Sequence, residues 1–212
     1  MDIFSTQNST GSHFRILTVC TGNICRSPLV EQYLRHSLHS FPQISVESAG
    51  TMARDGQDMP EQAKDLAKRR GLPLDGHSAR YLQAQHVSGA DLILVMEREH
   101  RRAVVSMFPR AAALTFTVRE FQRLSAGLTS AELAPTDARS DVAGRLRAGV
   151  AAVAARRGLV PGPVNAADDD VVDPYRLADA VFDQSASQMY PAADAVIRVL
   201  RASALDVSPD GR

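Results

Sequence analysis

A thiol and a guanidinium group stand close together on the stretch Cys20-Thr-Gly-Asn-Ile-Cys-Arg-Ser-Pro28, with five residues between Cys20 and Arg26. This stretch follows the apolar run 16–19 and precedes a helical pattern, so we expect a loop between a strand end and a helix start. Backbone N–H groups in such a loop point inward and bind a tetrahedral oxyanion. A thiol in that field is expected to ionise, and the fork of Arg26 can hold two phosphate oxygens. The combination predicts transfer of a phosphoryl group to sulfur.

The plainer interpretation is that Cys20 and Cys25 are ordinary buried thiols, because free cysteine often packs as a small hydrophobe. The other residue types in the stretch argue against it. Gly22 and Asn23 tolerate the unusual dihedral angles of a tight loop. Pro28 suits the first turn of a helix, where its missing N–H is no loss. A phosphate-binding loop therefore explains more of the stretch than a chance spacing does.

Composition limits the remaining possibilities. The chain has 212 residues, 44% of them hydrophobic, and a formal net charge of zero, which is enough for one domain with a core and gives no sign of a nucleic-acid surface. No apolar run approaches 18 residues, so we expect no membrane span. Two cysteines on one loop suit a reducing cytoplasm rather than a disulfide framework. No His ligands have metal-site spacing, so we expect neither a metal nor a cofactor.

Strand and helix patterns alternate along the chain. Strands are expected at Arg15–Val19, Ile44–Glu47, Ala90–Met96 and Ala113–Phe116. Helices are expected over 28–38, 60–71, 98–108, a short segment through Phe121 and Leu124, 141–157 and 177–201, the last kinked or interrupted by Pro191. The alternation predicts an α/β fold, an open four-stranded parallel sheet with helices on both faces. Ligands bind such sheets at the carboxyl ends of the strands, where the Cys20 loop would lie.

The ends of the chain and one internal stretch differ from the rest. We expect a flexible N-terminal extension over 1–13, a single domain over 14–202 and a flexible tail over 203–212. Within the domain, Ser125–Asp170 is rich in Ala, Gly, Pro and Asp. We interpret this stretch as a peripheral insert that contains one helix and one loop.

Five short segments now carry a resemblance. They are Val19–Pro28, Ser48-Ala-Gly50, His77-Ser-Ala-Arg80, Ala90–Met96 and Asp173-Pro-Tyr175. Together they resemble the low-molecular-weight protein tyrosine phosphatase family, and its bacterial branch more than its eukaryotic one. The resemblance covers roughly Arg15–Phe121 and Val171–Leu200, and Ser125–Asp170 is longer than the connection usual in that family.

The resemblance implies a role for each matched residue. Cys20 would be the nucleophile that forms a phosphocysteine, Arg26 the phosphate clamp and Asp173 the general acid and base. The phosphate-binding residues would be Thr21, Gly22, Asn23, Ile24, Cys25 and Arg26. Supporting roles would fall to Ser27 as a hydrogen-bond donor to the thiolate, to His77 behind Asn23, and to Tyr175 beside the cleft. Cys25 would be a second thiol able to form a disulfide with Cys20 on oxidation.

The assignment of the acid has a plainer alternative. Asp-Pro is a common turn dipeptide, and Asp168, Asp169 and Asp170 precede Asp173 in a run that reads as a solvated loop. Chemistry nevertheless requires an acid, because a phenolate with a pKa near 10 leaves more readily when protonated. Asp173 alone is followed by Pro and an aromatic residue. No metal is required, since loop amides and Arg26 balance the charge being transferred.

Other functions of the same fold stay open. An arsenate reductase would need a third cysteine, which the chain lacks. A protein-arginine phosphatase resembles this chain, but that branch carries Thr at the position of Ile24, whose apolar side chain favours phosphotyrosine. A non-catalytic phosphopeptide-binding or redox-sensing module would not need Cys20, Arg26 and Asp173 together. The expected partner is a phosphotyrosine protein, for which a bacterial tyrosine kinase is one candidate, with no nucleic acid or membrane partner.

Overall fold

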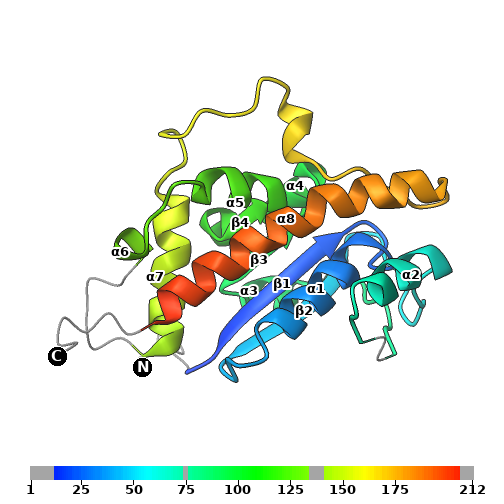
Figure 1. Ribbon diagram of the computed structural model, residues 1–212, viewed down its shortest axis with the longest axis horizontal. Helices are drawn as coiled ribbons and strands as arrows, with labels where there is room; N and C mark the ends of the chain where they lie inside the picture. Colours follow the sequence, from blue (N-terminus) through cyan, green and yellow to red (C-terminus); the bar gives the residue numbers. More distant parts are fainter. Residues whose placement is uncertain (1–11, 74–75, 134–140, 206–212) are drawn as a thin grey trace, which may run out of the picture.

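The computed structural model describes residues 12–73, 76–133 and 141–205 (Figure 1). Its centre is a four-stranded sheet in the order β2-β1-β3-β4, in which each neighbouring pair is parallel. The strands are β1 (Phe14–Cys20), β2 (Ile44–Gly50), β3 (Leu92–Val95) and β4 (Thr115–Thr117). The predicted parallel sheet is confirmed.

Eight α-helices and two 3₁₀ helices are found in the described residues. They are α1 (Arg26–Ser37), α2 (Glu61–Arg69), α3 (Ala84–Ser88), α4 (Arg98–Met107), η1 (Pro109–Ala113), α5 (Val118–Ser125), α6 (Ser130–Leu133), α7 (Val142–Ala154), η2 (Ala166–Asp169) and α8 (Asp179–Ala204). Every long helix agrees with the sequence prediction to within a few residues at each end. The sequence did not predict α3, α6, η1 or η2, because four or five residues are too few for a periodic pattern.

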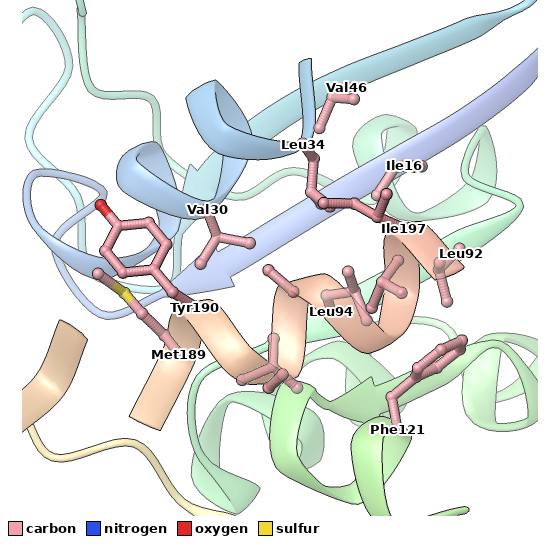
Figure 2. Packing of buried hydrophobic residues seen from close by; sticks show 14 of the residues in the cluster. Ile16, Val30, Leu34, Val46, Leu92, Leu94, Phe121, Met189, Tyr190 and Ile197 are labelled. Atoms are coloured by element: carbon pink, nitrogen blue, oxygen red, sulfur yellow. The ribbon is translucent and has the colours of Figure 1, made fainter. Parts of the chain in front are cut away.

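The side chains of the strands alternate between two faces, and each face has its own apolar cluster. One cluster contains Ile16, Leu92 and Leu94 and joins the sheet to α1, α5, α7 and α8. The other contains Leu17, Ile93 and Val95, together with residues of α3 and α4. Figure 2 shows the first cluster, with the labelled sheet residues close to side chains of α1 and α8. Helices therefore cover both faces, as the alternation of elements predicted.

The stretch that we interpreted as a peripheral insert contains a core helix instead. Leu146, Val150 and Val153 of α7 are fully buried in the main cluster, and α7 packs against α5 and α8. Gly149 lies at the contact with α8, where a Cβ atom would meet Ser203 Oγ at 2.0 Å. The prediction of a peripheral helix is therefore wrong. Gly149 weakens the helix pattern in the sequence, but its missing side chain is what allows α7 to pack closely against α8.

The last helix is continuous. α8 runs from Asp179 to Ala204 through Pro191, so of the kink or interruption expected there, the interruption does not occur. Because α8 packs against α1, α2, α5, α6 and α7, tertiary contacts outweigh the backbone hydrogen bond that proline cannot donate. Of the segments expected to be flexible, 1–13 and 203–212, residues 1–11 and 206–212 lie outside the described residues. The prediction is wrong for Ser203 and Ala204, which are buried in α8. Within 12–73, 76–133 and 141–205, no helix is long and apolar enough to cross a membrane.

The topology brings two strand ends together around one loop. β1 ends at Cys20 and α1 begins at Arg26, so the chain between them closes at the carboxyl edge of the sheet. Gly50 at the end of β2 lies so close that a Cβ atom there would meet Thr21 O at 2.6 Å. Thr51 N–H donates to Cys20 O at 3.0 Å and Met52 N–H donates to Thr21 O at 2.8 Å. The loop between β1 and α1 is therefore held by the end of β2 as well as by its own turn.

Candidate active site

The sulfur of Cys20 lies inside the curled loop and receives hydrogen bonds from two directions. The backbone N–H of Asn23 donates to Cys20 Sγ at 3.2 Å. Ser27 Oγ lies 3.0 Å from the same sulfur and accepts from Asn23 Nδ2 at 3.0 Å. When Cys20 is a thiolate its sulfur carries no proton, so the hydroxyl of Ser27 is then the donor to sulfur. Both donors stabilise negative charge on Cys20.

Asn23 holds the shape of the loop. Its backbone lies in the left-handed region, with φ of 53°, which asparagine tolerates better than most residues. Its amide also donates to Ser48 Oγ at 2.7 Å, and its Oδ1 accepts from the backbone N–H of Arg80 at 2.8 Å. His77 Nε2 lies 2.6 Å from Asn23 O. The backbone N–H and C=O and both side-chain polar atoms of this buried residue are thus bonded, so the left-handed turn is fixed by its surroundings.

Arg26 is almost fully buried, and its guanidinium is held by three groups. Nη1 donates to a carboxylate oxygen of Glu97 and to Val171 O at 2.9 Å, and Nη2 lies 2.9 Å from Asp173 Oδ2. Burial opposes the charge, but Cys20, Asp173 and Glu97 outweigh it and raise the pKa of Arg26.

The Nε atom of Arg26 is buried and has no hydrogen-bond partner among the described residues. Nε and Nη2 form one edge of the planar guanidinium, the edge that can bind two oxygens of one phosphate group. Glu97 and the carbonyl of Val171 fix the opposite part of the fork. The edge formed by Nε and Nη2 is therefore the part of the guanidinium that remains for an anion to bind. In this structure Nη2 is bonded to Asp173.

The acidic run before Asp173 anchors the loop that carries it. Asp169 pairs with Arg123 at 2.7 Å. Asp170 accepts four hydrogen bonds from Arg98, one from its backbone N–H at 2.8 Å and three from its guanidinium at 2.9–3.2 Å. These two carboxylates are therefore structural, and our interpretation of the run as a solvated loop is wrong for them. Asp173, with a side chain 44% exposed, is the carboxylate of this loop that faces Arg26.

A cavity of about 300 Å³ opens above the loop. Cys20 and Arg26 lie on its lining, together with Asp173. Its outer part is formed by Met52 and Tyr175, residues that are 73% and 41% exposed. The remaining lining residues are Thr21, Gly22, Ile24, Cys25, Arg54, Gln57 and Arg176. A thiol, a guanidinium group and a carboxylate thus share one cavity with Met52 and Tyr175 at its mouth.

Cys25 lies on the same loop and is also a free thiol. Burial, followed by the nearby Cys20 and Asp173, raises the pKa of Cys25 to about 12. The side chain therefore stays protonated near neutral pH. Of the two thiols, Cys20 is the one whose sulfur lies within hydrogen-bond distance of the Asn23 N–H and the Ser27 hydroxyl.

Two residues of the site were not predicted from the sequence. Glu97 lies two residues after the end of β3 and binds Arg26. His100 of α4 lies 2.9 Å from Thr21 Oγ1 through its Nε2. Burial, and then the charge of Arg26, lowers the pKa of His100 to about 4, so the ring is neutral. Glu97 could have been noticed in the sequence because it is an acidic residue at the carboxyl end of an apolar strand. Nothing in the sequence pattern around His100 indicates a role in the site.

The structure thus gathers the predicted residues at one place. Cys20, Arg26 and Asp173 line the cavity, and Ser27 and His77 lie behind it on the hydrogen bonds of Asn23. Tyr175 lines the mouth. In the described part of the chain, no group of three or more His, Cys, Asp or Glu side chains could hold a metal ion.

Comparisons with known proteins agree with this geometry. Residues 15–134 match the family described as low molecular weight phosphotyrosine protein phosphatase. Over 108 residues the chain is 36% identical to a protein-arginine-phosphatase of Geobacillus stearothermophilus, covering 51% of this chain and 71% of that protein. Over 100 residues it is 42% identical to the low molecular weight protein-tyrosine-phosphatase Etp of Escherichia coli K12, covering 47% and 66%. The crystal structure of the Erwinia amylovora tyrosine phosphatase AmsI superposes with a TM-score of 0.62 at 25% identity, covering 90% of this chain and 95% of that one.

Proposed function

Since the chain belongs to the low molecular weight phosphotyrosine protein phosphatase family, we propose that it hydrolyses phosphotyrosine in proteins through a phosphocysteine formed on Cys20. The observation that carries this proposal is the position of Cys20 Sγ, which accepts hydrogen bonds inside the loop that leads into Arg26, the first residue of α1. A thiolate on Cys20 would be stabilised by these hydrogen bonds, and the guanidinium of Arg26 would hold the phosphate group that the thiolate attacks.

In the first step the phosphate binds the Nε and Nη2 edge of Arg26 and the N–H groups of the loop. The thiolate of Cys20 attacks phosphorus, so an S–P bond forms while the bond from phosphorus to the phenolic oxygen breaks. Asp173 gives its proton to that oxygen, and tyrosine leaves as a neutral phenol. Asp173 carries a proton at this stage because the phosphate dianion disfavours a second negative charge beside it.

In the second step a water molecule attacks the phosphorus of the phosphocysteine. The carboxylate of Asp173 takes a proton from this water, an O–P bond forms and the S–P bond breaks. Inorganic phosphate leaves and the thiolate of Cys20 is restored. The guanidinium of Arg26 and the loop N–H groups balance the charge on the equatorial oxygens in both steps.

The mouth of the cavity supports an aromatic substrate. Met52 and Tyr175 provide apolar contact at the entrance, and Ile24 lines the cavity further in. A phenyl ring gains free energy by leaving water between such side chains. Met52 stands in the loop after β2, which carries no aromatic residue, so thioether contact replaces ring stacking on that side.

Phosphoarginine is the second candidate substrate, because an arginine phosphatase is among the relatives of this chain. Three arginines line the cavity, Arg26, Arg54 and Arg176, and they disfavour a leaving group that becomes a guanidinium cation. Ile24 also offers no hydroxyl to a guanidinium N–H. We therefore place phosphotyrosine first.

The decisive experiment measures phosphate release from para-nitrophenyl phosphate, a phosphotyrosine peptide and a phosphoarginine peptide. Wild type and Cys20→Ser are compared under identical conditions, with circular dichroism to show that the variant is folded. We expect turnover of both aryl phosphates by wild type and none by Cys20→Ser. Equal turnover by the folded variant would refute the role of Cys20, and a preference for the phosphoarginine peptide would reassign the substrate.

The physiological partner follows from the substrate class. We propose a phosphotyrosine protein in the cytoplasm, and an autophosphorylated tyrosine kinase is the candidate to test first. Asp173→Ala keeps Cys20 and Arg26 and slows departure of tyrosine, so this variant should retain phosphoproteins long enough to be captured with it.

A further inference from the structure

The cavity contains more positive charge than the chemistry of one phosphate group requires. Arg54, in the loop after β2, and Arg176, directly after Tyr175, both line it. Both side chains are exposed, so their guanidinium groups lie at the mouth rather than at the base that Arg26 occupies. Arg54 stands two residues after Met52, and Arg176 is next to Tyr175. Each of the two segments that provide an apolar side chain at the mouth therefore also provides a cation.

Neither guanidinium pairs with a carboxylate in the part of the chain that the structure describes. Other exposed arginines do pair, for example Arg69 with Asp183 and Arg102 with Glu99. The contact found for Arg176 is the ring of Tyr175, 5.0 Å from its guanidinium carbon. An arginine stacked on an aromatic ring keeps its planar edge available for an anion.

The described residues that line the cavity carry more positive than negative charge. Among the described residues that line it, the one carboxylate is Asp173, and this group is paired with Arg26. A dianionic phosphate at the base of the cavity would engage Arg26 and the loop N–H groups. Arg54 and Arg176 would then still lack anionic partners among the described residues, which leaves both guanidinium groups able to pair with anionic groups of a substrate.

The position of Arg176 is fixed relative to the acid. Asp173 Oδ1 accepts from the N–H of Tyr175 at 3.2 Å, and the N–H of Leu177 donates to Pro174 O at 3.0 Å. Arg176 lies in this turn with φ of 61°, a conformation that is uncommon for a residue other than glycine. The turn that carries the general acid therefore also sets the direction of Arg176.

We propose that Arg54 and Arg176 determine specificity by binding anionic groups next to the phosphotyrosine of the substrate. This inference rests on the proposed phosphotyrosine phosphatase activity. An extended peptide advances about 3.3 Å per residue, so the residues directly before and after phosphotyrosine lie over the mouth of a cavity whose base holds the phosphate. Guanidinium groups bind carboxylate and phosphate with the same two-donor geometry, and either anion satisfies the proposal.

The test compares kcat/KM for four phosphotyrosine peptides of one length. The residues on each side of phosphotyrosine are Gln, Glu, phosphoserine or Lys, and para-nitrophenyl phosphate is measured in parallel. We expect wild type at low salt to prefer the Glu and phosphoserine peptides over the Gln peptide by about five- to tenfold, as two partly exposed charge pairs would give. The preference should shrink as NaCl rises, because salt screens exposed charges. The two anionic peptides together show whether carboxylate or phosphate is favoured.

The variants are Arg54→Gln, Arg176→Gln and the double variant. Each single change should reduce the preference for anionic peptides two- to threefold, and the double change should abolish it. Arg110→Gln is the matched control, since this exposed arginine lies in η1, which leads into the start of β4 at the opposite edge of the sheet. The control should keep the full preference.

Three results would overturn the inference. They are equal rates for the Gln and Glu peptides in wild type, an unchanged preference in the double variant, or an equal loss of preference in Arg110→Gln. If wild type still hydrolyses para-nitrophenyl phosphate in a reaction that requires Cys20, the proposed function survives such a result. If it hydrolyses no aryl phosphate, the proposed function fails and the inference fails with it.

Discussion

Arg26 and Asp173 form an ion pair across the mouth of the phosphate loop, with Nη2 and Oδ2 2.9 Å apart. The proposed phosphate clamp and the proposed general acid are thus partners of each other. In the mechanism proposed above, phosphate binds the edge of the guanidinium to which Nη2 belongs, so a substrate and Asp173 would compete for the same donor. Release from Arg26 would free the carboxyl group to protonate the leaving oxygen, and substrate binding and acid catalysis would be coupled through one side chain.

Asp173→Asn should slow aryl phosphates with poor leaving groups more than those with good ones. A phenol of high pKa needs protonation as it leaves, and a nitrophenol of low pKa does not. We expect a loss of 10²-fold or more for phenyl phosphate and a clearly smaller loss for activated esters, measured as kcat across a leaving-group series. Asp168→Asn removes the same charge from the same loop and should leave the series unchanged. Equal slowing of every ester by Asp173→Asn would assign this residue a structural role.

Arg26→Lys should cost far more than a change that conserves charge usually does. A lysine ammonium cannot satisfy Glu97 and Val171 O and at the same time offer two parallel donors to phosphate. We expect a loss on the order of 10²-fold in kcat/KM, comparable to the removal of one oxyanion donor, and weaker inhibition by inorganic phosphate. Arg102→Lys, at an exposed ion pair, should have no effect. A loss of only a few-fold would mean that Arg26 does not bind phosphate through both donors.

Local chemistry made part of the site predictable. Cys20, Asn23 and Arg26 lie within one loop, so their residue types and spacing describe a turn, a nucleophile and an anion clamp together. The run Ile93-Leu94-Val95 is apolar on both faces, which is typical of an inner strand of a covered parallel sheet. These features depend on neighbours in sequence, and the strand-helix order follows from them.

Contacts between distant segments could not be predicted in the same way. Glu97 and His100 join the site because β3 lies beside β1 and delivers the start of α4 to the loop. Asp170 reads as one member of an acidic run, and only the position of Arg98 shows that it is an anchor. Gly149 looks like a defect in an amphipathic helix until Ser203 is placed against it. In each case the role of the residue is seen only when the partner from a distant segment is known.

His100 should make stability depend on pH. Its pKa is about 4 in the folded protein and near 6.5 when unfolded, so folding favours the neutral ring. The contribution is complete above pH 6.5 and is lost as pH falls from 6.5 toward 4, up to about 3 kcal/mol. His100→Gln keeps a donor for Thr21 but does not titrate. Urea denaturation from pH 7 to 4.5 should therefore show a smaller loss of stability in this variant, and parallel curves for the two proteins would refute the assignment.

Oxidation should inactivate the protein reversibly through Cys20, with Cys25 as the protecting thiol. Peroxide attacks a thiolate, which the proposed mechanism places on Cys20, whereas burial raises the pKa of Cys25 to about 12. A sulfenic acid at Cys20 can then condense with Cys25 to give a disulfide and water. Activity after peroxide followed by dithiothreitol should recover in wild type but only partly in Cys25→Ser. Equal recovery in both proteins would leave Cys25 as a packing residue.

Gly149→Ala should destabilise the protein although alanine is the better helix former. The added Cβ would stand 2.0 Å from Ser203 Oγ and 2.9 Å from its Cβ, so α7 and α8 must move apart. We expect the free energy of unfolding to fall by about 1–2 kcal/mol, since overpacking exceeds the gain in helix propensity of about 1 kcal/mol. Ser203→Ala, which removes the closest atom, should recover part of this loss in the double variant. Gly162→Ala is the control, because a Cβ there meets no atom within 4 Å. Turnover of para-nitrophenyl phosphate by the folded Gly149→Ala protein should stay near wild type, and a loss of activity without a loss of stability would instead connect α7 to the phosphate loop.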